Sequence, residues 1–177
     1  RFPAADTITA ETTGSERARI DSSGRVLIGT TTEGHDDADN LTIADSANAG
    51  VTIRSGTGNA GHIYFSDGTS GTDEYKGLIA YNQASDYFTL WTNGDGEKLR
   101  IDSSGRVLIG TTTEGQEDAD DLTIESSGSV GITLRSGTSA AGAIYFSDAT
   151  SGTAEYDGAI IYNQSSQFMD FYTAQSQ

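Results

Sequence analysis

The sequence predicts an all-β fold built from short strands in tandem units. Hydrophobic residues make up only 34% of the 177 residues, and they gather in short clusters rich in Val, Ile, Tyr and Phe. The clusters recur at roughly 8–12-residue intervals, which is typical of all-β architectures, and turn-forming runs such as SSG, SGT and NGDG separate them. No segment sustains helical periodicity over three turns. The best helix candidates are single turns at 33–40 and 114–121, so we expect very little helix.

An internal duplication sets the organisation of the chain. The stretch RIDSSGRVLIGTTTEG occurs at 19–34 and again, letter for letter, at 100–115. Pairing each residue with the one 81 positions later needs no gap from Glu16 to Gln177, and about fifty of the pairs are identical. We therefore predict repeat units at 16–96 and 97–177. Residues 1–15 are interpreted as the end of a preceding unit, because DTITAETTGSE echoes DYFTLWTNGDGE.

Each unit is expected to hold about seven strands. In the second unit they are 98–102, 106–111, 122–125, 131–135, 143–148, 159–163 and 168–173. In the first unit, Val51 and Ile53 alternate with polar residues in the way a half-buried strand does.

The repeated stretch carries the residues that a tight hairpin needs. Asp102 can accept hydrogen bonds from backbone two residues on, and Gly105 can take a positive φ without a Cβ penalty. We expect a type I turn with a bulge between the arms KLRI and RVLIG. The stretch holds no nucleophile, base or ligand cluster, so it is interpreted as structural.

Composition excludes several classes of partner. The formal net charge of −16 argues against binding nucleic acid or anionic membrane surfaces. The chain has no cysteine for disulfides or thiolate metal sites, and no apolar run approaches the length of a membrane span. The start, RFPAADTITAE, does not read as a signal peptide. With so few apolar residues, a single chain is expected to bury too little surface alone, and association with copies of itself would supply the rest.

The segments SERARIDSSGRVLIGTT and GEKLRIDSSGRVLIGTT resemble a signature of bacteriophage tail fibre proteins. The resemblance is strong over 16–34 and 97–115, and it extends more loosely over each unit. In that family the signature recurs along fibre shafts and just before an endosialidase-type chaperone domain. The usual VGIG reads VLIG here, and no chaperone domain follows Gln177, so no self-cleaving activity is carried over.

The resemblance implies an elongated, intertwined homotrimeric fibre in the virion, extracellular after lysis. Its role would be structural, as shaft and host-receptor adsorption element, with other tail or fibre proteins and a host cell-surface glycan as partners. It implies no enzyme activity and no cofactor.

Aromatic residues beside polar ones are the candidate receptor- or glycan-binding residues. They are Trp91, Tyr81, Tyr64, Tyr162 and Tyr172. Aromatic rings can stack on sugars while neighbouring amides such as Asn82 bind hydroxyls. The alternative is that these rings fill the interior of a thin trimer. Trp91 is the most informative, because a buried indole N–H needs a partner.

Acidic residues leave two other classes open. Glu74 and Glu155 could belong to a polysaccharide-depolymerising tailspike enzyme, which uses paired carboxylates, or they could be solvated turn acids. Asp37 and Asp39, with Asp118 and Asp120, have the spacing of hard oxygen ligands for calcium, as in a calcium-dependent bacterial surface adhesin. The expected alternative is an exposed acidic turn, and we predict no metal site.

Overall fold

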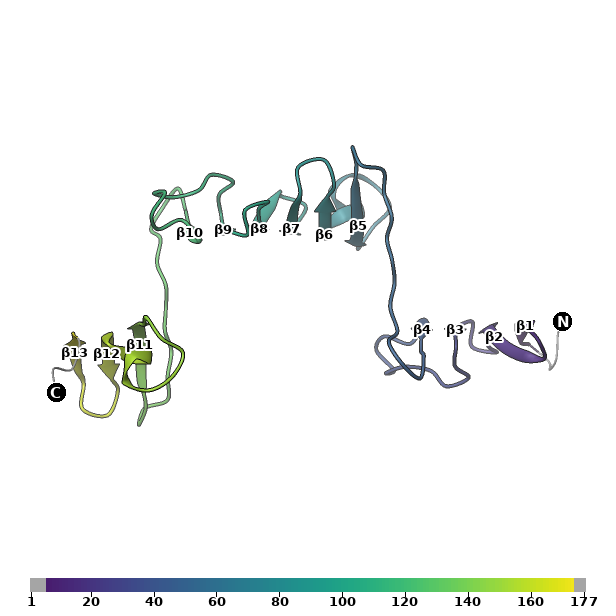
Figure 1. Cartoon of the computed structure of the whole chain (residues 1–177). Helices are drawn as coiled ribbons and strands as arrows, with labels where there is room; N and C mark the ends of the chain where they lie inside the picture. The colour runs from purple at the N-terminus through teal and green to yellow at the C-terminus, as the bar shows by residue number, and fades with distance from the viewer. Residues whose placement is uncertain (1–5, 174–177) are drawn as a thin grey trace. The chain divides into compact units, whose positions relative to one another are not determined.

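The computed structural model describes residues 6–173, and within them almost all regular structure is β (Figure 1). Strands account for 38% of the residues and helices for 5%. The strands are β1 (Ile8–Thr12), β2 (Ser15–Ile20), β3 (Val26–Ile28), β4 (Leu41–Ile43), β5 (Ala60–Phe65), β6 (Gly77–Asn82), β7 (Tyr87–Thr92), β8 (Glu97–Ile101), β9 (Val107–Ile109), β10 (Leu122–Ile124), β11 (Ala141–Phe146), β12 (Gly158–Asn163) and β13 (Phe168–Tyr172). Two short 3-10 helices, η1 (Gly71–Tyr75) and η2 (Thr153–Tyr156), complete the described part.

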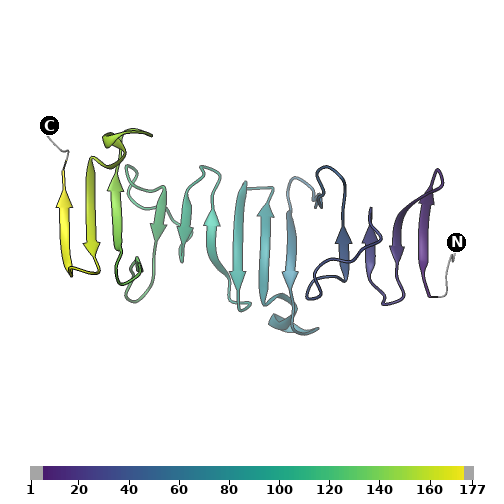
Figure 2. The same ribbon diagram turned by 90° about the horizontal axis from the view of Figure 1, so that it is seen from below.

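The strands form three sheets, with the orders β1-β2-β3-β4, β10-β9-β8-β7-β6-β5 and β11-β12-β13. In each sheet, strands that follow one another in sequence lie side by side (Figure 2). The hairpin β2·β3 is antiparallel and β3·β4 is parallel, and β8·β9 and β9·β10 repeat this arrangement 81 residues later. β1 pairs with β2 as β7 pairs with β8, each pair with a bulge. The limit between the two sequence repeats therefore falls inside the β7–β8 hairpin.

The DSSG turn has the geometry that its residues predict. The amide of Gly24 donates to the carbonyl of Asp21, and Oδ1 of Asp21 accepts from the amides of Ser23 and Arg25 at 2.9 and 3.0 Å. Gly24 and Gly105 have φ values of 83° and 87°. The predicted hairpins around both turns are confirmed.

Two further glycines are required by a close approach of the backbone. Gly29 and Gly110 follow β3 and β9 with φ values of 72° and 75°. A Cβ on Gly29 would collide with the carbonyl of Ala44, and a Cβ on Gly110 would collide with the carbonyl of Glu125. Each of these carbonyls directly follows the neighbouring parallel strand, β4 or β10. These glycines let the short parallel pairs form.

One secondary-structure prediction is wrong. Residues 51–54 and 131–135 alternate like strands but have no strand pairing in the described chain, because the fold brings no partner to them. Single hydrogen-bonded turns are present within 33–40 and 114–121, closed by the amides of Ala38 and Ala119, and the very low helix content is confirmed. The 3-10 helices lie instead at η1 and η2.

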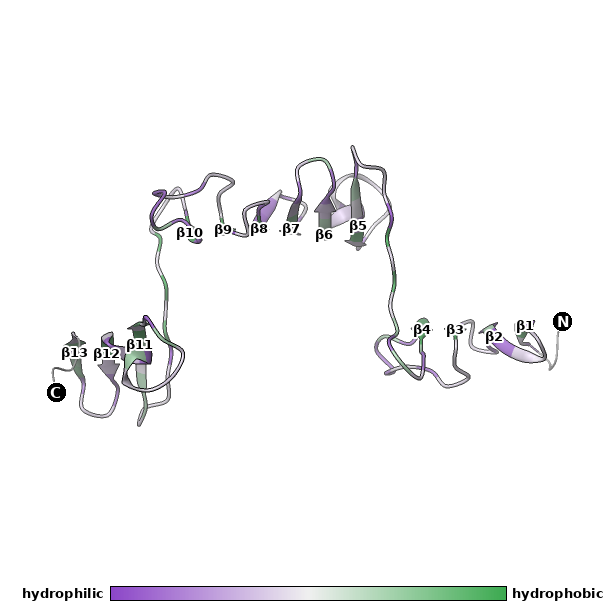
Figure 3. Cartoon of the chain, in the orientation of Figure 1, coloured by the Kyte–Doolittle hydropathy of each residue, from purple (hydrophilic) through white to green (hydrophobic). Residues whose placement is uncertain are grey.

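The sheets bury very little within one chain. Among the described residues the buried apolar side chains are Leu27, Leu78, Ala80, Leu108 and Ala159. Large hydrophobic side chains are exposed throughout all three sheets, including Ile8 at 50%, Tyr64 at 54% and Phe171 at 73%. Hydrophobic residues are spread along the strands and into the segments that join the sheets (Figure 3). A hydrophobic core of ordinary size is absent from the described part of the chain.

Candidate functional site

The five predicted binding residues all lie on strands, three in the six-stranded sheet and two in the three-stranded sheet. Tyr64 is on β5, Tyr81 on β6, Trp91 on β7, Tyr162 on β12 and Tyr172 on β13. Four of them are exposed, from 36% for Tyr162 to 54% for Tyr64, and Trp91 is half-buried.

Trp91 satisfies its indole N–H inside its own sheet. Nε1 donates to Oγ1 of Thr89 at 3.1 Å, and that hydroxyl donates to the carbonyl of Leu99 on β8 at 3.2 Å. Thr89 is 4% exposed and is in register with Arg100, which is in register with the buried Leu108. The polar end of the indole is therefore fixed, and its partly exposed ring is the part that could bind.

An arginine stacks on a tyrosine on the same face of β7 and β8. The guanidinium carbon of Arg100 lies 3.9 Å from the ring centroid of Tyr87, and its nitrogens hold the carboxylate of Glu97 in a bidentate pair at 2.5 and 2.8 Å. The hydrogen bonds that Arg100 donates to the carboxylate of Glu97 raise the pKa of Arg100. The guanidinium group of Arg100 is thus bound by Tyr87 and Glu97 of the same chain and holds these side chains in place on this face.

The C-terminal sheet brings together three tyrosines. Tyr145 and Tyr172 are each in register with Ala159, one on either side of it. Because Ala159 is small and buried, the two rings flank a depression of about 280 Å³, which Tyr156, Asp157 and Ile161 also line. In such a surface the aromatic rings could stack on a sugar, and the carboxylate could accept hydrogen bonds from the sugar's hydroxyl groups.

Tyr162 does not belong to this depression. It is in register with Met169, three positions along β12 from Ala159, so it points to the opposite face of the sheet from Tyr172. The sequence prediction missed Tyr156 and Asp157, which the 3-10 helix η2 places beside the strands. A difference between the two repeats could have pointed to this site, because Asp157 and Ala159 stand where the first unit has Lys76 and Leu78.

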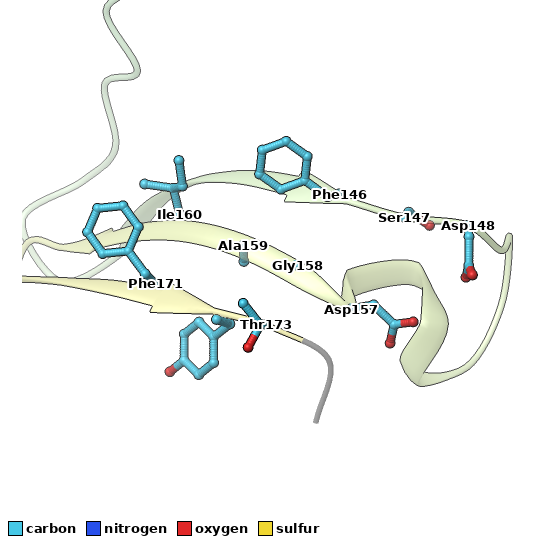
Figure 4. Close-up of a pocket in the computed structure, with 10 residues that line it drawn as sticks. Phe146, Ser147, Asp148, Asp157, Gly158, Ala159, Ile160, Phe171 and Thr173 are labelled. Atoms are coloured by element: carbon cyan, nitrogen blue, oxygen red, sulfur yellow. The ribbon is translucent and has the colours of Figure 1, made fainter. Parts of the chain in front are cut away.

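A second and larger hollow lies at the end of the same sheet. It measures about 670 Å³ and is mostly apolar, with Phe146, Ile160 and Phe171 on one side of the strands (Figure 4). Phe146 packs against Gly158, where an added Cβ would lie 3.1 Å from the Cβ of Phe146 and 3.3 Å from its ring. Two carboxylates, Asp148 and Asp157, lie toward the η2 end.

The acidic turns are held by arginines. Arg25 contacts Asp21 at 2.7 Å, Asp39 at 3.0 Å and Glu33 at 3.5 Å, and Arg106 repeats the set with Asp102, Asp120 and Glu114. Hydrogen bonds from Arg25 lower the pKa of Asp21. Asp39 and Asp120, considered above for calcium, therefore bind guanidinium groups, while the side chain of Asp37 is 93% exposed. No cluster of three potential metal ligands occurs in residues 6–173.

The remaining acids considered above are on the 3-10 helices. Glu74 lies in η1 and Glu155 in η2, and both are exposed. Between residues 6 and 173, no helix is long and apolar enough to cross a membrane.

No family model matches the chain, and no curated protein matches its sequence.

Proposed function

We propose that this chain is a structural segment of a bacteriophage tail fibre, in which three copies associate along their sheets to form shaft and host-adsorption surface. The proposal joins the tail fibre signature at 16–34 and 97–115 to the exposed apolar sheets. The observation that carries it is the burial of only five apolar side chains among the described residues.

The accessible surface gives the scale of the missing burial. A compact monomer of this mass would expose about 8,200 Å², whereas the chain exposes 13001 Å². The excess of about 4,800 Å² is the size of large obligate interfaces between subunits. Association with identical copies would cover this surface and pair open strand edges, which otherwise promote aggregation.

The adsorption role rests on the aromatic surfaces. The depression between Tyr145 and Tyr172 and the ring of Trp91 offer stacking faces beside polar groups. Since the chain carries a net charge of −16, an anionic ligand would be repelled. The receptor would therefore be a neutral cell-surface glycan.

Molar mass in solution tests the structural part of the proposal. Light scattering of the purified chain should give about three times its mass of 18.5 kDa, independent of dilution over the micromolar range. A well-folded monomer would contradict the proposal. Binding of the labelled assembly to whole bacterial cells, with and without added neutral glycans, then tests adsorption.

A further inference from the structure

Two equivalent segments that join the sheets have the sequence of strands but no strand pairing. We call Val51–Arg54 and Ile132–Arg135 the connector segments. Val51 and Ile53 are 69% and 46% exposed, and Ile132 and Leu134 are 65% and 50% exposed. Within residues 6–173, no backbone hydrogen bond involves either connector segment. Figure 3 shows hydrophobic stretches in both joining regions.

Each connector segment is held loosely against the strand that follows it. A Cβ on Gly61 of β5 would lie 3.1 Å from the side chain of Ile53, and one on Gly142 of β11 would lie 3.5 Å from that of Leu134. One apolar side chain of each segment thus packs on its own chain, while Val51 and Ile132 stay in solvent. Both segments are rich in β-branched residues, Val, Ile and Thr, which favour a paired strand, so the single chain leaves this preference unmet.

The arginine of each connector segment indicates the charge of the surface that would contact it. Arg54 and Arg135 are exposed, and among the described residues neither forms an ion pair. By contrast, Arg19, Arg25, Lys76, Lys98, Arg100 and Arg106 all contact carboxylates of the chain itself. Acidic groups of a partner would pair with Arg54 and Arg135, and a second copy of this strongly acidic chain supplies such groups.

A second copy also supplies edge strands. β4 and β5 flank the first connector segment in sequence, β10 and β11 flank the second, and each of the four is the last strand of its sheet. An edge strand presents unpaired N–H and C=O groups, which accept an added strand from another chain. The same elements thus provide both the donor segments and the acceptor edges in every copy.

We infer that Val51–Arg54 and Ile132–Arg135 are intermolecular strands, each pairing with an edge strand of a second copy of this chain while Arg54 and Arg135 bind that copy's carboxylates. The inference rests on the proposed self-association and names the segments that carry it. The apolar pair of each segment and its arginine then form one contact, repeated at an 81-residue spacing in the sequence.

Residue-resolved hydrogen exchange on the assembled wild-type protein tests the backbone part. The amides of the connector segments should exchange at least 100-fold more slowly than those of Asn48–Gly50 and Ser129–Gly131, which also lack backbone hydrogen bonds. The β2·β3 hairpin serves as the protected reference. Fast exchange in the connector segments of a confirmed trimer would overturn the inference and leave the proposed function standing. A monomer by light scattering would overturn both.

A charge-matched pair of double variants tests the arginines. Arg54→Gln with Arg135→Gln should raise the dissociation constant of the assembly at least tenfold, with less dependence on salt. Arg17→Gln with Lys98→Gln removes the same charge at another repeated pair of positions, where Arg17 bonds Thr12 and Lys98 bonds Asp95 within the chain. This control should leave the dissociation constant within about threefold of the wild type. Equal weakening by both double variants would assign the effect to net charge and overturn the arginine contact.

Discussion

At the scale of the residue, two glycines of one repeat are required for different physical reasons. Gly105 and Gly110 both have positive φ, but a Cβ on Gly105 would meet open space, whereas one on Gly110 would meet the carbonyl of Glu125. The first glycine is required by conformation alone. The second is required by conformation and by the approach of the parallel neighbour.

Substituting the two glycines should therefore cost different amounts. Gly105→Ala should lower the free energy of unfolding by about 1–2 kcal/mol, the cost of a non-glycine residue in the left-handed region. Gly110→Ala should cost a further ~1–3 kcal/mol, because the backbone must shift to relieve the overlap. Denaturant titration at one protein concentration measures both. Equal losses would contradict the close approach at Gly110.

Serine hydroxyls differ in whether the chain itself supplies a hydrogen-bond partner. Oγ of Ser55 and of Ser136 is buried with no hydrogen-bond partner in the described chain. Oγ of Ser66 instead donates to the carbonyls of Gly68 and Asp73 at 2.6 and 3.0 Å, and Ser147 repeats this clamp.

Alanine at these serines should separate unsatisfied hydroxyls from satisfied ones. Ser55→Ala with Ser136→Ala should leave the melting temperature unchanged or raise it, since an unpaired buried hydroxyl is costly to keep. Ser66→Ala with Ser147→Ala should cost about 0.5–1.5 kcal/mol for each lost clamp. Scanning calorimetry compares the two double variants, and a marked loss in the first would mean that Ser55 and Ser136 have partners in the assembly.

At the scale of the element, each hairpin is tied to the loop that follows it by one arginine. Arg25 binds both the turn residue Asp21 and Asp39, which lies fourteen positions after the arginine, and so holds the loop that leads into the parallel strand β4. Thr9 in the first sheet is equivalent to Thr89 in the second but lacks its hydrogen bond. Oγ1 of Thr89 accepts from the indole of Trp91, whereas Oγ1 of Thr9 has no partner in the described chain. Glu11 stands at the position equivalent to Trp91.

The arginine clusters predict a pH dependence with a definite sign. The pKa of Asp21 is lowered by its hydrogen bonds from Arg25, and that of Glu16 by those from Arg19. A lowered folded-state pKa adds stability above the unfolded-state value, about 4 for these groups, and this stability is lost as the pH falls through the folded-state value. The melting temperature should therefore hold from pH 7 to about 5 and fall in more acidic buffer.

A double variant supplies the control for that prediction. Arg25→Gln with Arg106→Gln should lower the melting temperature at pH 7 and flatten its decline in acid, because the carboxylates have lost their hydrogen-bond donors. An acid decline as steep as that of the wild type would show that other groups cause it.

At the scale of the whole molecule, the aromatic surfaces and the apolar sheets predict separate functions. If this chain recognises a receptor, binding should depend on exposed rings rather than on the hairpins that are identical in the two repeats. The side chains of these hairpins bind within their own turns. Trp91→Ala should therefore weaken adsorption to host cells at least tenfold. Ser104→Ala, at a turn position that uses its backbone amide, should leave adsorption unchanged. Equal adsorption by both correctly assembled variants would leave this segment as shaft alone.

What the sequence determined by itself is the local structure. The DSSG turn, its glycine and both hairpins depend on contacts within a few residues, and six of the seven strands expected in the second unit are present. The tertiary structure alone decided the rest. It left the connector segments unpaired because a strand needs a partner that sequence alternation cannot supply. It placed Tyr172 with Tyr145 and away from Tyr162 because register, set across strands, decides which side chains share a face.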